Sequence, residues 1–300
     1  MSWYAVDALD EALAEAKSLL APVDVGVWVR LAVITLFAGL SPPQTPSVSV
    51  DVPPQAVVEY GENLLRPQLL PAAVSLLVIG ILLAVGFAVV GSVMEFVLVD
   101  ALRSRDVRIL GPFKRRLGPG LRLFAFRVAV GLVVLLATAG VAVPVFLAAT
   151  TGTVLPLLAL VVTVPLLAVV GALAALASEF TTAFVVPLMA ERGDTLLGGW
   201  RRLWPTLRAD WREFAVYVLV KIVLVVGAGV VFSLAGAIVA IPLGLAVFGA
   251  VLTPVAFVAV AVAGILGFLV LAAVSVPVVT GLRYHSLCTL DASGVEFTLH

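Results

Sequence analysis

Charged residues are absent from four long stretches of the chain, and these stretches determine the expected architecture. They cover 31–50, 67–94, 128–178 and 222–282. A helix that crosses a bilayer needs about 20 apolar residues, so each of the two longest stretches suits two crossings joined by a turn. Small residues, Thr and Pro place those turns at 150–153 and 249–254. We therefore expect six membrane-spanning helices, near 25–41, 69–98, 123–149, 155–188, 214–246 and 254–282.

The first of these spans has the weakest pattern, because Ser41, Pro42 and Pro43 interrupt it. A five-span alternative, in which residues 25–40 form a re-entrant or interfacial segment, therefore stays open. In both cases a Pro-rich loop follows over residues 42–67. The first 24 residues are rich in acidic side chains and predict a short amphipathic helix with one apolar face, made of Leu9, Leu13, Ala16 and Leu20.

Composition explains why lipid must surround most of the chain. Hydrophobic residues make up 62% of the sequence, charged residues 12%, and the mean hydropathy is +1.21. An ordinary soluble domain is about 45–50% apolar and about 25% charged. The expected fold is therefore an all-α integral membrane helical bundle in a single domain, 1–300. The formal net charge of zero argues against a nucleic-acid partner, and the lipid bilayer is the expected one.

Basic residues are concentrated in two segments, 101–122 and 190–213, whereas the turns at 150–156 and 249–254 carry no charge. Segments rich in Lys and Arg stay on the cytoplasmic side of a membrane. We therefore expect both basic segments and both termini in the cytoplasm, the Pro-rich loop outside, and the protein in the plasma membrane.

The two basic segments resemble each other, which predicts an internal repeat. Residues 113–117 (Phe-Lys-Arg-Arg-Leu) align with residues 200–204 (Trp-Arg-Arg-Leu-Trp) at an offset of 87. A weaker third copy begins near Asp7. We interpret these as three parallel units, each a cytoplasmic amphipathic segment followed by two spans. Chance similarity between hydrophobic sequences is the alternative.

Four charges lie inside or near the spans, namely Glu95, Arg127, Glu179 and Lys221. Such charges are costly in lipid and usually face the interior of a bundle. At about 1.5 Å of rise per residue, Glu95 and Arg127 lie at similar depths, and so do Glu179 and Lys221. We therefore predict two ion pairs. They either fix the helix register or, with Glu179, form a proton or ion path, and snorkelling of the two basic residues to the cytoplasm is a third alternative.

Aromatic and basic residues alternate in both cytoplasmic segments. On a helix over 200–214 the aromatic residues share one face with Leu207, and three arginines flank it. Trp and basic side chains are favoured at lipid headgroups. The face either contacts lipid or packs on the ends of the spans. The candidate interfacial residues are Phe113, Lys114, Arg115, Arg116, Trp200, Arg201, Arg202, Trp204, Arg208, Trp211 and Arg212.

No pattern in the sequence indicates catalysis, so we expect no catalytic residues, no metal site and no cofactor. His285 lies three residues before Cys288, but two ligands do not make a zinc site. The glycine pairs at 118–120 and 198–199 are typical of turns, and no phosphate-binding loop is present.

Several short segments resemble uncharacterised polytopic membrane proteins of halophilic archaea. The likeness rests on 1–9 (MSWYAVDAL), 95–104 (EFVLVDALRS), 120–124 (GLRLF), 200–208 (WRRLWPTLR) and Tyr217. A fainter likeness is to the membrane region of glycerophosphodiester phosphodiesterases, whose catalytic domain has no counterpart here. The resemblance implies a membrane protein of this organisation and no particular chemistry.

Two functions are compatible with these observations. The first is a non-enzymatic membrane scaffold or accessory subunit that contacts lipid or another membrane protein through the basic-aromatic segments. The alternative is a transporter or channel-like permease with a polar path near Glu179 and Lys221.

Overall fold

The computed structural model describes residues 3–39, 70–193, 195–252, 256–295 and 297, and every regular element among them is helical. Most elements are α-helices, with a 3₁₀ turn (η1) and a π-helical turn (η2) around α7. In chain order they are α1 (Tyr4–Leu20), α2 (Val25–Gly39), α4 (Leu70–Ser104), α5 (Leu110–Arg115), α6 (Leu117–Thr151), η1 (Leu155–Ala159), α7 (Leu160–Phe180), η2 (Thr181–Val185), α8 (Val186–Arg192), α9 (Leu196–Ala209), α10 (Trp211–Leu252) and α11 (Ala256–Ala292).

Five helical segments are long and apolar enough to cross a membrane: Leu70–Ser104, Leu117–Thr151, Leu155–Arg192, Trp211–Val247 and Phe257–Ala292. The expected first span corresponds to α2, which has 15 residues. A helix of that length rises about 22 Å, less than the roughly 30 Å of a hydrocarbon core. Residues 40–41 of that span and the Pro-rich loop 42–67 lie outside the described residues. Among the described residues, the structure therefore has five helical segments that could span a membrane and one shorter apolar helix.

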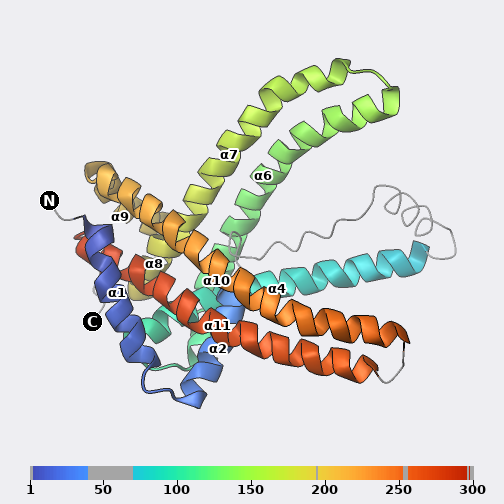
Figure 1. Cartoon of the computed structure of the whole chain (residues 1–300). Coiled ribbons are helices and arrows are strands. Elements are labelled where there is room, and N and C mark those ends of the chain that lie inside the picture. Colours follow the sequence, from blue (N-terminus) through green and yellow to red (C-terminus); the bar gives the residue numbers. More distant parts are fainter. Residues whose placement is uncertain (1–2, 40–69, 194, 253–255, 296, 298–300) are drawn as a thin grey trace.

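The long helices project from a common base (Figure 1). The hairpin of α6 and α7, the helix α4 and the hairpin of α10 and α11 form three diverging arms. The short helices α1, α8 and α9 lie at the opposite end, together with both termini (Figure 1). The turn expected at 150–153 ends α6, because Gly152 adopts the left-handed conformation with φ of 65°. The second expected turn falls between α10 and α11, where residues 253–255 are not described.

Side chains are buried in the base and exposed along the arms. In α4 nearly every residue up to Ala88 is exposed, whereas Gly91 to Val99 are all buried. The buried core continues through α8 and the last turns of α11. The exposed part of α4 is about 20 residues, or about 30 Å, which matches a hydrocarbon core. The arms therefore provide the surface that meets lipid, and the base provides the protein interior.

The N-terminal helix packs on α11 through alanines and not through the leucine face that its sequence predicts. Its buried residues are Ala5, Ala8, Ala12 and Ala16, whereas Leu13 is exposed. Small side chains permit close approach of two helix backbones, a contact that leucines would prevent. The backbone oxygen of Ala5 accepts a hydrogen bond from His285 Nε2 at 2.8 Å, so α1 is joined to α11 by polar as well as apolar contacts.

A close crossing between α4 and α6 generates a prediction. A Cβ atom added at Gly120 would lie 2.9 Å from the Cα of Val93, and a backbone atom has no rotamer by which to move away. We expect Gly120→Ala to destabilise the fold by about 1–3 kcal/mol, measured by SDS-induced unfolding in mixed micelles. Gly131→Ala on the same helix is the control, because open space surrounds Gly131. Equal stability of the two variants would contradict the observed crossing.

Candidate functional site

The first predicted ion pair is present, and a third charge joins it. Arg127 Nη2 on α6 lies 3.0 Å from Glu95 Oε1 on α4, and Arg127 Nη1 donates to Ser92 Oγ at 3.3 Å. The second Glu95 oxygen accepts from Arg283 on α11. Glu95 is 0% exposed. A buried carboxylate is tolerated only when its charge is paired and its oxygens are hydrogen-bonded, and both conditions are met here.

The second predicted ion pair is also present, within a larger hydrogen-bonded group. Lys221 Nζ on α10 lies 3.2 Å from Glu179 Oε1 on α7. It also donates to Ser286 Oγ at 3.0 Å and to the backbone oxygen of Leu282 at 3.3 Å. The hydroxyl of Tyr217 donates to Glu179 Oε1 at 3.0 Å. An ammonium group has three donors, so protein atoms use all the donors of Lys221.

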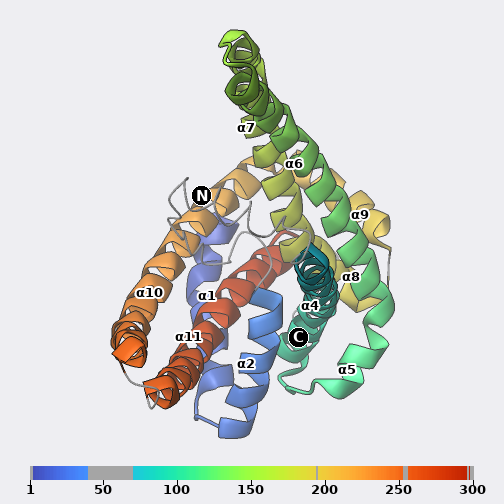
Figure 2. The same ribbon diagram turned by 90° about the vertical axis from the view of Figure 1, so that its right-hand side faces the viewer.

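The helices α2, α4, α6, α7, α10 and α11 form a ring through pairwise contacts, with α11 against α2. Figure 2 shows α10, α11, α2 and α4 in that order from left to right. Glu95 and Arg127 join α4 to α6, and Glu179 and Lys221 join α7 to α10. A third junction joins α11 to α2, where the Ser275 and Thr35 hydroxyls lie 3.2 Å apart. Polar side chains therefore connect helices at three junctions of the ring, two by ion pairs and one by a hydroxyl pair.

The four charges lie where the arms enter the base. Glu95 follows Val90 by five residues, so it lies about 7 Å along the helix axis beyond the exposed apolar part of α4. If that apolar part occupies the hydrocarbon core, the buried charges are level with the inner headgroups. Their position costs less than a position in the middle of an arm, because the protein and nearby water surround them.

A π-helical turn begins two residues after Glu179. The turn Thr181–Val185 precedes Pro187, which has no N–H to bond the carbonyl four residues earlier. The backbone oxygen of Thr182 accepts from Arg283 Nη1 at 3.0 Å, and the Thr181 hydroxyl accepts from Trp200 Nε1 at 3.1 Å. The turn therefore brings two polar groups, the Thr182 carbonyl and the Thr181 hydroxyl, into contact with Arg283 and Trp200.

The basic-aromatic residues fall into two classes. Phe113, Arg116, Trp200 and Arg202 are partly buried, and Arg116 is held by Asp100 at 2.7 Å. The other seven candidates are exposed, namely Lys114, Arg115, Arg201, Trp204, Arg208, Trp211 and Arg212. The predicted continuous helix over 200–214 is wrong, because α9 ends at Ala209 and α10 begins at Trp211. Trp200 and Phe214 consequently face the protein, and the predicted single aromatic face is divided.

Two exposed tryptophans carry stacked arginines at the junction of α9 and α10. The guanidinium of Arg208 lies 4.9 Å from the ring centroid of Trp204, and that of Arg212 lies 5.6 Å from the ring of Trp211. Trp204 is 47% exposed and Trp211 is 61% exposed. Cation–π contacts hold such side chains in place at little cost, so the junction presents two ordered Trp–Arg pairs to its surroundings.

Sequence reasoning missed four members of the charge network. Arg283 directly follows the last charge-free stretch, but α11 continues past it to Ala292, which leaves Arg283 partly buried and His285 buried. Tyr217 and Ser286 lack a distinctive sequence signal.

Metal-binding geometry is not found in the part of the chain that the structure describes: no three His, Cys, Asp or Glu side chains there could hold an ion together. His285 bonds to α1, and Cys288 is buried as a free thiol.

The long apolar helices and the charge network at their base define a multi-pass α-helical membrane protein. The chain belongs to the family described as "Family of unknown function (DUF7544)", whose model matches residues 3–300. No curated protein and no solved structure matches it.

Glu95 provides a direct test of the network. Glu95→Gln leaves Arg127 and Arg283 near each other without their shared carboxylate, and removing one partner of a buried ion pair costs about 3–5 kcal/mol. We expect a loss of that size in SDS-induced unfolding. Glu11→Gln, on an exposed position of α1, is the control and should leave stability unchanged. A Glu95→Gln variant as stable as the control would mean that the carboxylate does not hold the base together.

Proposed function

We propose that the protein is a non-enzymatic membrane scaffold or accessory subunit, whose cytoplasmic basic-aromatic segments contact lipid or a partner protein. The exposed Trp–Arg pairs at the junction of α9 and α10 carry this proposal. A monomeric protein that worked alone would gain nothing from two exposed tryptophans beside arginines, and these are the residue types enriched at binding hot spots and lipid headgroups.

The saturation of the charge network supports the same proposal. Glu95 and Lys221 are buried, and protein atoms fill their bonding positions. A group that must release and rebind an ion needs a free bonding position in at least one state. The contacts that the network makes are those expected of a structural clamp, which fixes the arms relative to the base.

Topology and symmetry form part of the proposal. The basic segments and both termini lie at one end of the long helices (Figure 1), and the positive-inside rule assigns that end to the cytoplasm of the plasma membrane. The element order supports three parallel units with α2 as a sixth, shorter span, because α1 precedes α2 and α4, α5 precedes α6 and α7, and α9 precedes α10 and α11. The junctions of the ring then join successive units.

Tryptophan fluorescence tests the lipid contact. In a variant with Trp3, Trp28 and Trp200 replaced by Phe, only Trp204 and Trp211 emit. This variant is reconstituted in vesicles of phosphatidylcholine and phosphatidylglycerol. We expect a spin label on the lipid headgroup to quench the tryptophan fluorescence at least twofold more than a label at the end of the acyl chain. The reason is that stacked Trp–Arg pairs prefer the interface.

The control for this measurement is the complementary variant, in which Trp204 and Trp211 are replaced and Trp28 remains, since Trp28 is partly buried and bonds to the backbone of Leu20. Emission of Trp204 and Trp211 that is typical of water and insensitive to both labels would exclude the lipid contact. The partner protein would then be the remaining form of the proposal.

The second candidate function is a transporter or permease with a path near Glu179 and Lys221. A specific observation favours keeping it: a π-helical turn begins two residues after Glu179, and such turns are frequent at functional sites. Glu179 is also more exposed than Glu95, with 23% of its side chain accessible.

Glu179→Gln separates the two functions. For a scaffold we expect the variant to lose about 2–3 kcal/mol of stability, because Lys221 stays buried without its carboxylate, and we expect no proton flux above empty vesicles from either protein. For a permease, parent proteoliposomes loaded with a pH-sensitive dye should show proton flux, and the variant should lose it while unfolding like the parent. Glu11→Gln is again the matched control. A variant identical to the parent in both respects would exclude both roles of Glu179.

A further inference from the structure

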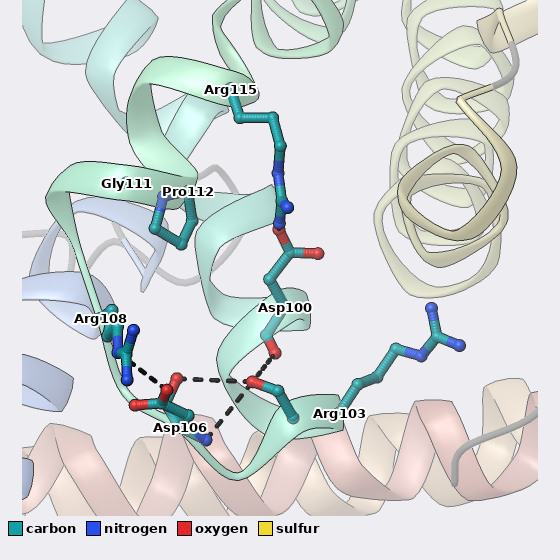
Figure 3. Close-up of a pocket in the computed structure, with 8 residues that line it drawn as sticks. Asp100, Arg103, Asp106, Arg108, Gly111, Pro112 and Arg115 are labelled. Atoms are coloured by element: carbon teal, nitrogen blue, oxygen red, sulfur yellow. Dashed lines mark hydrogen bonds and ion pairs between the residues drawn. The ribbon is translucent and has the colours of Figure 1, made fainter.

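A cavity of about 680 Å³ lies at the base end of α4, where the chain turns into α5 (Figure 3). Its size is within the range of small-molecule sites, about 300–1,000 Å³. Charged side chains dominate its wall, and no function described above uses it. The lining residues are Asp100, Arg103, Ser104, Asp106, Arg108, Gly111, Pro112 and Arg115.

Hydrogen bonds between neighbouring residues fix the shape of this cavity. Asp100 accepts from Arg116 at 2.7 and 2.9 Å and from Arg115 at 3.1 Å. Ser104 Oγ donates to the backbone oxygen of Asp100 at 2.7 Å and accepts from the backbone N–H of Asp106 at 3.3 Å. Arg105, between them, has a φ of 52°. A non-glycine residue in this region costs about 1–3 kcal/mol and persists only where its surroundings impose it.

The wall carries an excess of positive charge. Three arginines and two aspartates line the cavity, a balance of +3 − 2 = +1. The balance stays +1 when the outer partners Arg116 and Glu191 are counted, because they contribute opposite charges. The side chains of Arg108 and Arg115 are 75% and 68% exposed. Each holds an aspartate with part of its guanidinium, and the fork of a guanidinium has five donors.

We propose that this cavity binds a phosphate-bearing anion, with Arg108 and Arg115 as its contacts and Arg103 at the edge. Guanidinium groups match phosphate oxygens in pairs of parallel hydrogen bonds, and the aspartates hold the arginines in place while a net charge of +1 remains on the wall. The inference names the class of ligand that the basic-aromatic segment around α5 would bind. In this respect it rests on the proposed function.

Two sources supply this chemistry: a lipid headgroup of the inner leaflet and a soluble phosphate compound. Asp100 lies ten residues beyond Val90, or about 15 Å along α4 from the exposed apolar part. The cavity therefore opens on the aqueous side of the headgroups, within reach of a soluble ligand and at the limit for a lipid. The experiment uses one probe for each source.

Gly111 and Gly118 offer a matched pair of variants. Gly111 lines the cavity and Gly118 does not, and open space surrounds an added Cβ at both positions. Gly111→Glu places a negative charge at the cavity wall, where its Cβ meets no other atom. Gly118→Glu places the same charge on the same cytoplasmic segment outside the cavity. Arg108→Gln is a second variant of the cavity, on a side chain that is 75% exposed and forms its ion pair with Asp106.

The full-length protein in detergent would be tested with two probes. Equilibrium dialysis measures inorganic phosphate, and native mass spectrometry measures retention of phosphatidylglycerol over phosphatidylcholine. We expect at least one probe to bind the parent, and we expect Gly111→Glu and Arg108→Gln to weaken that probe at least tenfold, with Gly118→Glu unchanged. Phosphate as the affected probe identifies a soluble ligand, and phosphatidylglycerol identifies a headgroup.

Binding that is equal in the parent, Gly111→Glu and Arg108→Gln would overturn the inference, and so would a parent that binds neither probe. These outcomes are distinct from failure of the proposed function, because Trp204 and Trp211 lie on other helices and their quenching does not depend on the cavity.

Discussion

The carboxylate of Glu95, buried between Arg127 and Arg283, is the interaction on which the rest of the base depends. Its partners come from α6 and α11, and Arg283 continues to the π-helical turn through the backbone of Thr182. One side chain thereby connects four parts of the ring. Charged hydrogen bonds are stronger where water is scarce, but leaving such a carboxylate unpaired would be very costly. The arrangement therefore specifies one packing of these helices and penalises every other.

The arms obey a different constraint from the base. Lipid tails are as apolar as the leucines and valines of α6, α7 and α10, so no hydrophobic force draws one arm against another. Within the described residues the ion pairs that join these helices lie in or near the base, and the arms diverge beyond it (Figure 1). Stability and orientation thus come from the base, while the arms provide contact with the membrane.

Much of this organisation follows from the sequence, and the exceptions have identifiable causes. Charge-free stretches predict the long helices. Matched depths predict both ion pairs, because an unpaired charge is costly near the hydrocarbon core. Arg283 was missed because a charge at the end of an apolar stretch is usually solvated, and only the fold shows that α11 continues into the base. On α1, the sequence predicts a buried Leu13, but Leu13 is exposed because the alanines of α1 allow its backbone to approach α11 closely. Asp210 separates α9 from α10, which no aromatic periodicity over 200–214 could reveal.

The docking of α1 on α11 has a consequence for synthesis and insertion. Ala5 and His285, like Thr35 and Ser275, are contacts between the earliest and the latest parts of the chain. The ribosome synthesises α1 and α2 long before α11, the helix on which they pack. These two helices can therefore pack only after the intervening hairpins have entered the bilayer. Ring closure is then the final step of assembly, and the alanine stripe of α1 stays open to other proteins until that step is complete.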